Sequence, residues 1–211
     1  MTSILKADTI QDADGNNIIN ESSNTITIGA SGDTISIPSG ATIANSGTAT
    51  GFGISNAQSF YLSSSKTIAA GTQTVIDSTW TALATTKVGI IGSASNVTVS
   101  SGIFSFATTG IYLVETTMNF YAEGSTAGRY VMGNIDVTAN NSSYTYAGQA
   151  TSQVANTSGS NDNTAVYPPA MVDVDDTSNV KVRLSAQGES EIKTETQNTG
   201  FIIRFIKLGD T

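Results

Sequence analysis

The stretch GIFSFATTGIYLVETTMNFY, residues 102–121, decides the expected fold. Phe104 and Phe106 share one face of its first half, and apolar or β-branched residues alternate with other residues along 112–120. An alternation with a period of two predicts half-buried β-strands, because successive side chains of a strand point to opposite faces. Residues 108–110, TTG, provide a turn between the two halves. The stretch therefore predicts a β-hairpin.

The composition of the whole chain also favours strands and turns. Ser, Thr, Asn and Gly make up close to half of the 211 residues, whereas charged residues make up only 12%. Thr suits strands, and Asn, Gly and Ser suit turns. We find no amphipathic helical pattern, so an all-β fold is expected.

The chain contains neither Cys nor His, which narrows its possible chemistry. Disulfides, thiolate metal sites and the Ser-His-Asp and Cys-His mechanisms are excluded. A net charge of −8 without a Lys/Arg cluster disfavours nucleic acid as a partner. The first residues lack a secretory signal pattern, and no apolar run is long enough to span a membrane. We expect no enzymatic activity, cofactor or metal, no membrane insertion, and synthesis in a cytoplasm.

Three segments are expected along the chain, at residues 1–24, 25–53 and 54–211. The first reads as a short strand, a turn around Gly15 and a second short strand. Because an arm of this size cannot own a hydrophobic core, it is expected to dock on another surface.

Isoleucines recur in the second segment, at Ile26, Ile28, Ile35, Ile37 and Ile43. The first pair precedes the second by nine residues, and each pair precedes a Gly-containing turn. Ordering residues 25–53 costs more conformational entropy than the burial of five isoleucines returns on one chain. Three chains around a common axis would bury these side chains together, which predicts a trimeric stem. The alternative is a flexible Gly/Ser/Thr linker.

The third segment is expected to form a head of short strands. Besides the central stretch, strands are predicted at residues 60–68, 74–83, 88–91, 96–100, 130–137, 144–150, 167–173, 179–184, 191–196 and 201–208. Residues 152–163 are very polar and predict an exposed loop. Short strands separated by regular turn signals indicate a β-sandwich or jelly roll.

The last predicted strand is apolar on both faces: one carries Phe201, Ile203 and Phe205, and the other carries Ile202, Ile206 and Leu208. A two-layer sandwich buries only one face of each sheet, so the second face should contact a neighbouring subunit. We assign Phe201, Ile203 and Phe205 to the trimer interface of the head. Arg204 then needs a carboxylate partner, for which Glu115 is a candidate.

Several polar groups are candidate sites. Asp173, Asp175 and Asp176 form the densest acidic cluster, which suits either calcium or a solvated turn. Glu189, Glu191 and Glu195 share one strand face with Lys193, as on the wet face of an edge strand. A carboxylate pair could hydrolyse a glycoside, but nothing in the sequence selects a pair.

Five tyrosines are expected near loop tips or strand ends: Tyr121, Tyr130, Tyr144, Tyr146 and Tyr167. Aromatic rings beside Asn, Ser and Asp suit sugar binding, because the rings stack on apolar sugar faces while polar neighbours bind hydroxyls. Tyr121, Tyr144, Tyr146 and Tyr167 are therefore candidate glycan-binding residues. The alternative is that each completes the core or a subunit seam.

The pattern G-x-F-x-F-x-x-x-G-I-Y-L-V, residues 102–114, resembles the central signature of complement-type globular heads and tumour-necrosis-factor-like jelly rolls. The closing strand GFIIRFIKL, residues 200–208, resembles the last strand of those heads, and the strand at 180–184 resembles a late strand of theirs. Thr177 and Ser178 stand where the family pattern has Gly-Asp, and Val114 replaces an aromatic. The resemblance covers about residues 59–208 and implies a trimeric jelly-roll head.

The N-terminal segments, with ILKADTIQD, NNIIN and TITIGASGD, resemble the beginnings of virion fibre proteins of tailed phages, particularly those of marine cyanobacteria. This resemblance implies a homotrimeric virion fibre or head-decoration protein. Residues 1–24 would dock on other virion proteins, and the head would contact host surface glycan. Two alternatives stay open: a purely structural protein that stabilises the particle without a ligand, and a polysaccharide-degrading tailspike.

Overall fold

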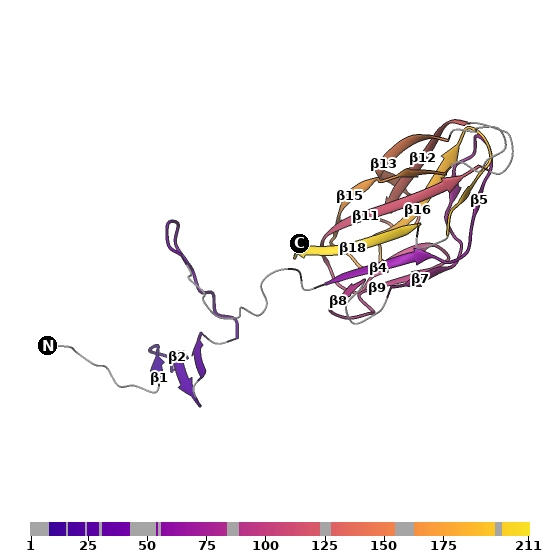
Figure 1. Ribbon diagram of the computed structural model, residues 1–211. Coiled ribbons are helices and arrows are strands. Elements are labelled where there is room, and N and C mark those ends of the chain that lie inside the picture. Colours follow the sequence, from indigo (N-terminus) through magenta and orange to yellow (C-terminus); the bar gives the residue numbers. More distant parts are fainter. Residues whose placement is uncertain are drawn as a thin grey trace. The chain divides into compact units, whose positions relative to one another are not determined.

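The computed structural model describes residues 9–15, 17–23, 25–29, 31–42, 54, 56–83, 89–122, 128–154, 163–196 and 200–211. The chain divides into two compact units, Met1–Ala49 and Thr50–Thr211, each of which is described by itself. Every regular element in the described ranges is a β-strand (Figure 1), so the all-β prediction is confirmed. Ile43 and most of the loop predicted at 152–163 lie outside the described residues.

The first unit contains an antiparallel sheet of three short strands, β1 Thr9–Gln11, β2 Asn17–Ser22 and β3 Thr25–Ile28, in the order β1-β2-β3. The turn before β2 contains Gly15, whose φ of 88° is a conformation that glycine adopts without strain. Because β3 pairs with β2, the boundary predicted between residues 24 and 25 falls inside a β-hairpin. The predicted arm and the start of the predicted stem therefore share one sheet.

The described residues of the second unit form fifteen strands: β4 Ala57–Leu62, β5 Thr67–Ile68, β6 Thr74–Val75, β7 Trp80–Ala82, β8 Ile90–Ile91, β9 Val97–Ser100, β10 Ile103–Phe106, β11 Gly110–Tyr121, β12 Gly128–Thr138, β13 Thr145–Val154, β14 Asn163–Val166, β15 Pro169–Val174, β16 Lys181–Gly188, β17 Ile192–Thr194 and β18 Ile202–Gly209. One sheet, the β12 sheet, has the order β13-β12-β16-β10-β9, with β6 also paired to β16. The other, the β11 sheet, has the order β5-β17-β11-β18-β4-β7, with β14 and β15 paired to β11 and β8 paired to β4. The two sheets pack as the layers of a sandwich (Figure 1).

The predicted hairpin at residues 102–121 is wrong in its pairing, although both strands exist. β10 belongs to the β12 sheet and β11 to the β11 sheet, so residues 107–109 carry the chain from one layer to the other. The predicted inward faces are confirmed, because Phe104, Phe106, Tyr112 and Val114 are all buried. Across the layers, the ring centroids of Phe106 and Tyr112 lie 4.7 Å apart. The alternating pattern is compatible with two strands paired in one sheet and with two strands in facing sheets. Here β10 and β11 lie in facing sheets.

The assignment of Phe201, Ile203 and Phe205 to a trimer interface is also wrong. These side chains are 0%, 0% and 1% exposed within the single chain, where they belong to the sandwich core. The aromatic rings of β18 complete the inner cluster, since Phe205 lies 5.1 Å from Phe104 between ring centroids. The outer face of β18 is the one that carries Ile202, Ile206 and Leu208.

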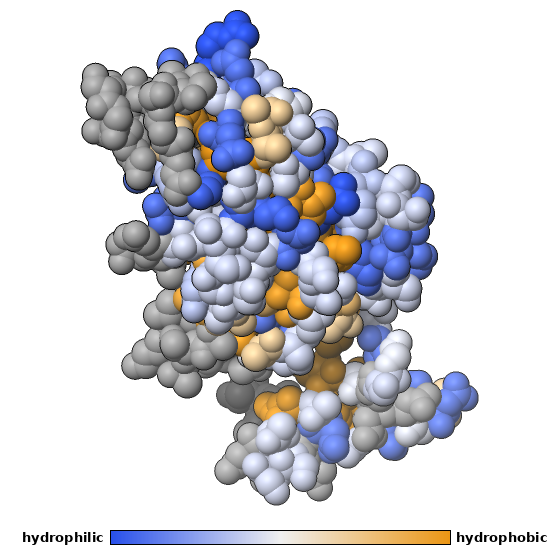
Figure 2. Space-filling model, turned by 90° about the vertical axis from the view of Figure 1, so that its right-hand side faces the viewer, coloured by the Kyte–Doolittle hydropathy of each residue, from blue (hydrophilic) through white to orange (hydrophobic). Residues whose placement is uncertain are grey.

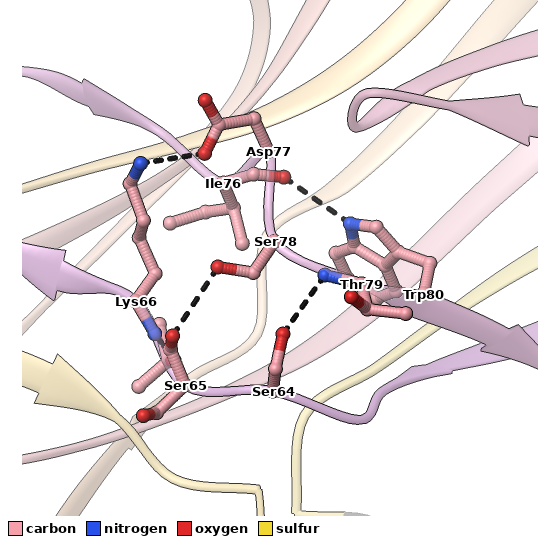
Figure 3. A network of polar contacts seen from close by, with 9 residues as sticks. Ser64, Ser65, Lys66, Ile76, Asp77, Ser78, Thr79 and Trp80 are labelled. Carbon is pink, nitrogen blue, oxygen red and sulfur yellow. Dashed lines mark hydrogen bonds and ion pairs between the residues drawn. The ribbon is translucent and has the colours of Figure 1, made fainter.

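The strand predicted at 74–83 is interrupted between β6 and β7. The interrupting segment is bound to the chain before β5 by polar contacts (Figure 3), which include an ion pair of 2.6 Å between Lys66 Nζ and Asp77 Oδ1. The indole nitrogen of Trp80 donates to the carbonyl of Ile76 over 3.1 Å. The chain therefore forms two separate strands here, with β6 paired to β16 and β7 paired to β4.

Candidate ligand-binding site

The outer face of the β12 sheet carries a row of polar side chains across three neighbouring strands. Tyr146 of β13 lies opposite Asp136 of β12, and Asp136 lies opposite Arg183 of β16. Ile135 and Leu184, their neighbours along the chain, are fully buried in the core. Because side chains alternate along a strand, the polar row faces away from the core.

Asp136 is buried although it lies on this outer face, with 1% of its surface exposed. Arg183 Nε donates to Asp136 Oδ2 over 3.2 Å, whereas Oδ1 has no hydrogen-bond partner among the described residues. Burial raises the pKa of the Asp136 carboxyl, and the nearby Ser185 hydroxyl and Arg183 guanidinium oppose that shift. The site therefore contains a buried carboxylate oxygen that can accept a further hydrogen bond.

Two tyrosines and a glutamine surround this ion pair. The guanidinium carbon of Arg183 lies 3.8 Å from the ring centroid of Tyr144, in a cation–π contact. Burial raises the pKa of the Tyr144 hydroxyl. Tyr146 donates its hydroxyl to Gln73 Oε1 over 2.6 Å, and Gln73 Nε2 donates to Ser185 Oγ over 2.9 Å. These contacts hold both rings in place at the edge of the sheet.

These side chains line an open surface hollow of about 430 Å³, which we call the Asp136 hollow. It is lined by Gln73, Asp136, Tyr144, Thr145, Tyr146 and Arg183. The lining combines one anion and one cation that neutralise each other, several hydrogen-bonding groups, and a Tyr146 side chain that is 57% exposed. A few convergent polar groups beside aromatic surface are typical of small-ligand sites.

We expect the substitution Asp136→Asn to change how stability depends on pH. The folded-state pKa of Asp136 is raised above the ordinary value of 3.8, so the folded state binds more protons than the unfolded state between the two values. The contribution of this carboxyl to the free energy of unfolding therefore falls as pH rises through that window. Asparagine does not titrate. In urea unfolding from about pH 3 to pH 8, the free energy of wild type minus that of the variant should decrease with rising pH. A constant or rising difference would contradict the prediction.

The other predicted tyrosines lie apart from this hollow. Tyr121 is half-buried at the end of β11, and Tyr130 is half-buried on β12. Tyr167 is 64% exposed and borders a smaller hollow of about 170 Å³ that also includes Glu115 and Arg204. Glu115 and Arg204 lie directly opposite each other in the register of β11 and β18, as expected for partners of opposite charge. The structure thus brings only Tyr144 and Tyr146 together.

Two of the predicted acidic residues have clear local contacts. Asp176 organises a turn, because Oδ1 accepts from the Ser178 amide and Oδ2 from Asn179 Nδ2, each over 2.7 Å. These hydrogen bonds lower the pKa of Asp176. Glu189 accepts from Arg129 Nε over 2.7 Å and pairs with its terminal nitrogen at 2.6 Å. Within the described ranges, no group of three acidic side chains could hold a metal ion.

Asp173, Asp175 and Glu191 are exposed, as expected for a solvated turn and a wet strand face. The prediction of an edge strand near residues 191–196 is wrong, because β17 pairs with β5 on one side and with β11 on the other. The amide of Glu195 donates to the carbonyl of Asn119 over 2.8 Å, which extends the contact with β11.

Asp136, Arg183 and Gln73 were not among the predicted site residues. One signal does exist, because Asp136 interrupts the strand pattern between Ile135 and Val137, and Asp is depleted in strands. Its pairing with Arg183 depends on the register of β12 against β16, which the sequence alone does not provide.

The sheet order and the two facing layers make the second unit a β-sandwich of the jelly-roll kind. No family model matches the sequence, and no curated protein matches it significantly. Several solved structures do match the structure of this chain. Murine APRIL at pH 5.0 has a TM-score of 0.53 and 10% identity, covering 72% of this chain and 98% of that chain. Eiger TNF from S. frugiperda has a TM-score of 0.53 and 16% identity, covering 74% of this chain and 93% of that chain.

At identities this low the structural matches show the fold alone. They confirm the predicted jelly roll. Among the described residues there is no helix long and apolar enough to cross a membrane.

Proposed function

We propose that this chain is the subunit of a homotrimeric virion appendage, a fibre or head-decoration protein whose head contacts host surface glycan. The resemblance of residues 1–53 to the beginnings of phage fibre proteins supports the virion role. The jelly-roll head supports the homotrimer, because the family that the head resembles in sequence implies a trimer. Tyr146, at 57% exposed, supplies aromatic surface that suits sugar binding.

The observation that carries the proposal is an apolar face on the small sheet of the first unit. Ile10 lies opposite Ile19, Ile19 lies opposite Ile28, and Ile26 shares their face two residues before Ile28. The exposed fraction is 40% for Ile10, 36% for Ile19, 68% for Ile26 and 56% for Ile28. A three-stranded sheet of this length is marginal unless an apolar face is covered. Two further copies of the same sheet would cover it in a trimer.

Ile35 and Ile37, two of the predicted stem residues, are 58% and 47% exposed in the segment that follows the sheet. They are further apolar side chains that the single chain leaves exposed. Ile18, at 47% exposed, lies on the opposite face of the sheet. Figure 2 shows hydrophobic side chains at the surface as separate patches among polar ones.

The head offers its own apolar row for contact with a second copy. The row crosses five neighbouring strands, β15, β11, β18, β4 and β8, and each member lies opposite the next in the register. Its members are Met171, Leu113, Ile206, Ala57 and Ile91. They are on the outer face of the β11 sheet, where Met171 is 68% exposed and Ile91 is 49% exposed. This row replaces Phe201, Ile203 and Phe205 as the proposed trimer contact of the head.

Light scattering after size exclusion tests the self-association. The full chain at micromolar concentration is expected to have three times the 21.7 kDa mass of one chain. Ile19→Asp should shift the protein toward monomer, because a charge in a covered apolar face is costly. Ile18→Asp, on the opposite face of the same strand, is the matched control and should leave the trimer intact. A folded wild-type monomer would overturn the proposal.

Adsorption experiments test the virion role. The full chain is expected to bind host cells, and host lipopolysaccharide should compete with that binding. Normal adsorption by particles that lack the protein, together with altered particle stability, would instead indicate the purely structural role. Release of reducing sugar from host polysaccharide would indicate a tailspike enzyme.

A further inference from the structure

We propose that the Asp136 hollow is a saccharide-binding site that takes a neutral sugar residue through Asp136, Gln73 and Tyr146. The inference rests on the proposed contact of the head with host glycan, and it specifies both the site and the class of sugar. Three properties of the hollow carry it: an unsatisfied acceptor, a balanced charge and an exposed ring.

The first property is the buried Oδ1 atom of Asp136, which has no hydrogen-bond partner among the described residues. A buried acceptor without a partner is costly, and a ligand hydroxyl that donates to it removes that cost. Asp136 also lines the hollow. Because its side chain is only 1% exposed, a ligand hydroxyl reaches the carboxylate when that side chain turns toward the hollow. The site therefore selects a ligand with hydrogen-bond donors, and sugar hydroxyls supply them.

The second property is the charge of the hollow. Asp136 and Arg183 form an ion pair at 3.2 Å, and the guanidinium of Arg183 lies against Tyr144. Arg183 is the only cation among the lining residues, and it is already paired. An acidic sugar would place its carboxylate near Asp136 without a second cation to offset the repulsion. The hollow accordingly favours a neutral sugar over a uronic or sialic acid.

The third property is the ring of Tyr146, which is 57% exposed at the rim of the hollow. Its hydroxyl donates to Gln73 Oε1, so the ring is held while one part of its surface stays open. An aromatic ring of this kind stacks on the apolar face of a pyranose. A hollow of about 430 Å³ falls in the range of small-ligand sites and has room for a terminal sugar residue.

The test uses saturation-transfer difference NMR on the full chain. The probes are free glucose, galactose, mannose and N-acetylglucosamine, with glucuronic acid and sialic acid as acidic counterparts. We expect transfer to at least one neutral sugar and a weaker signal from the acidic ones. Tyr146→Ala should weaken the apparent affinity by about fivefold or more because stacking is lost. Asp136→Asn should weaken the apparent affinity by about tenfold, because a hydrogen bond to a charged carboxylate is stronger than one to a neutral amide.

Tyr167→Ala is the matched control, because Tyr167 is equally exposed but borders a different hollow. It should leave sugar binding unchanged. Tyr146 is a surface residue, so its truncation leaves the core intact, and a melting curve for each variant identifies any that fails to fold. No transfer from any neutral sugar, or equal transfer in wild type and Tyr146→Ala, would overturn the inference.

The outcomes separate this inference from the proposed function. Cell binding by the full chain that survives Tyr146→Ala would refute the Asp136 hollow as the glycan site and leave adsorption standing. Sugar binding in the hollow without any binding to host cells would uphold this site and contradict the role in adsorption.

Discussion

Phe104→Ala is expected to lower the free energy of unfolding by about 3–5 kcal/mol. Phe104 of β10 is fully buried, and its ring packs against three aromatic rings of the facing layer, the β11 sheet. The centroid distances are 5.3 Å to Phe60, 5.2 Å to Trp80 and 5.1 Å to Phe205. Truncation removes the transfer free energy of the ring and leaves a cavity that these rings cannot fill without changing rotamer.

Urea unfolding at one fixed protein concentration measures this loss, since assembly makes apparent stability depend on concentration. Tyr167→Ala is the control, because Tyr167 is 64% exposed, and it should change the free energy by less than about 0.5 kcal/mol. A loss below about 1 kcal/mol for Phe104→Ala would mean that the aromatic cluster collapses onto the vacated space, contrary to the close packing expected of a protein interior.

The sequence predicts which residues of a strand face the core better than it predicts the partners of that strand. The alternation from Tyr112 to Phe120 identifies the inward face of β11 correctly, because burial follows the period of two. The same alternation cannot tell whether β10 lies beside β11 or across from it, since both arrangements bury Phe104 and Phe106. Pairing depends on contacts between distant segments, such as β10 with β16.

A strand that is apolar on both faces shows a second limit. In β18 the pattern identifies two apolar faces, but it does not say which one meets the aromatic cluster of the other layer. In the structure Ile203 and Phe205, with Phe201 just before the strand, face the interior, while Ile202 and Ile206 are half-buried on the outer face. The outer face of β18 is part of the proposed contact between subunits, because Leu113 and Met171 continue its apolar surface on neighbouring strands.

The Asp136 hollow could be predicted only in part. Tyr144 and Tyr146 are found from their aromatic character among polar neighbours. Asp136 and Arg183 come from strands separated by more than forty residues, and their meeting is a consequence of the β12–β16 register. A charge in the middle of a strand is a usable signal, but its partner becomes visible only when the register is known.

Gly148→Ala is expected to destabilise the head by at least about 1–3 kcal/mol. A Cβ atom at this position would lie 2.2 Å from the carbonyl oxygen and 3.0 Å from the carbonyl carbon of Pro169. Both are backbone atoms, so no side chain can rotate away, and β13 would have to move from the start of β15. The substitution tests whether the layers pack as closely as described, because glycine is required here for space.

Gly209→Ala is the matched control, since a Cβ atom there would have nothing within 4 Å. It should change the free energy of unfolding by less than about 0.5 kcal/mol. Both variants add one methyl group to a strand glycine of the same domain, so the difference between them isolates the steric term from the intrinsic preference of alanine over glycine. Equal stability of the two variants in urea unfolding would show that β13 and β15 are farther apart than this arrangement requires.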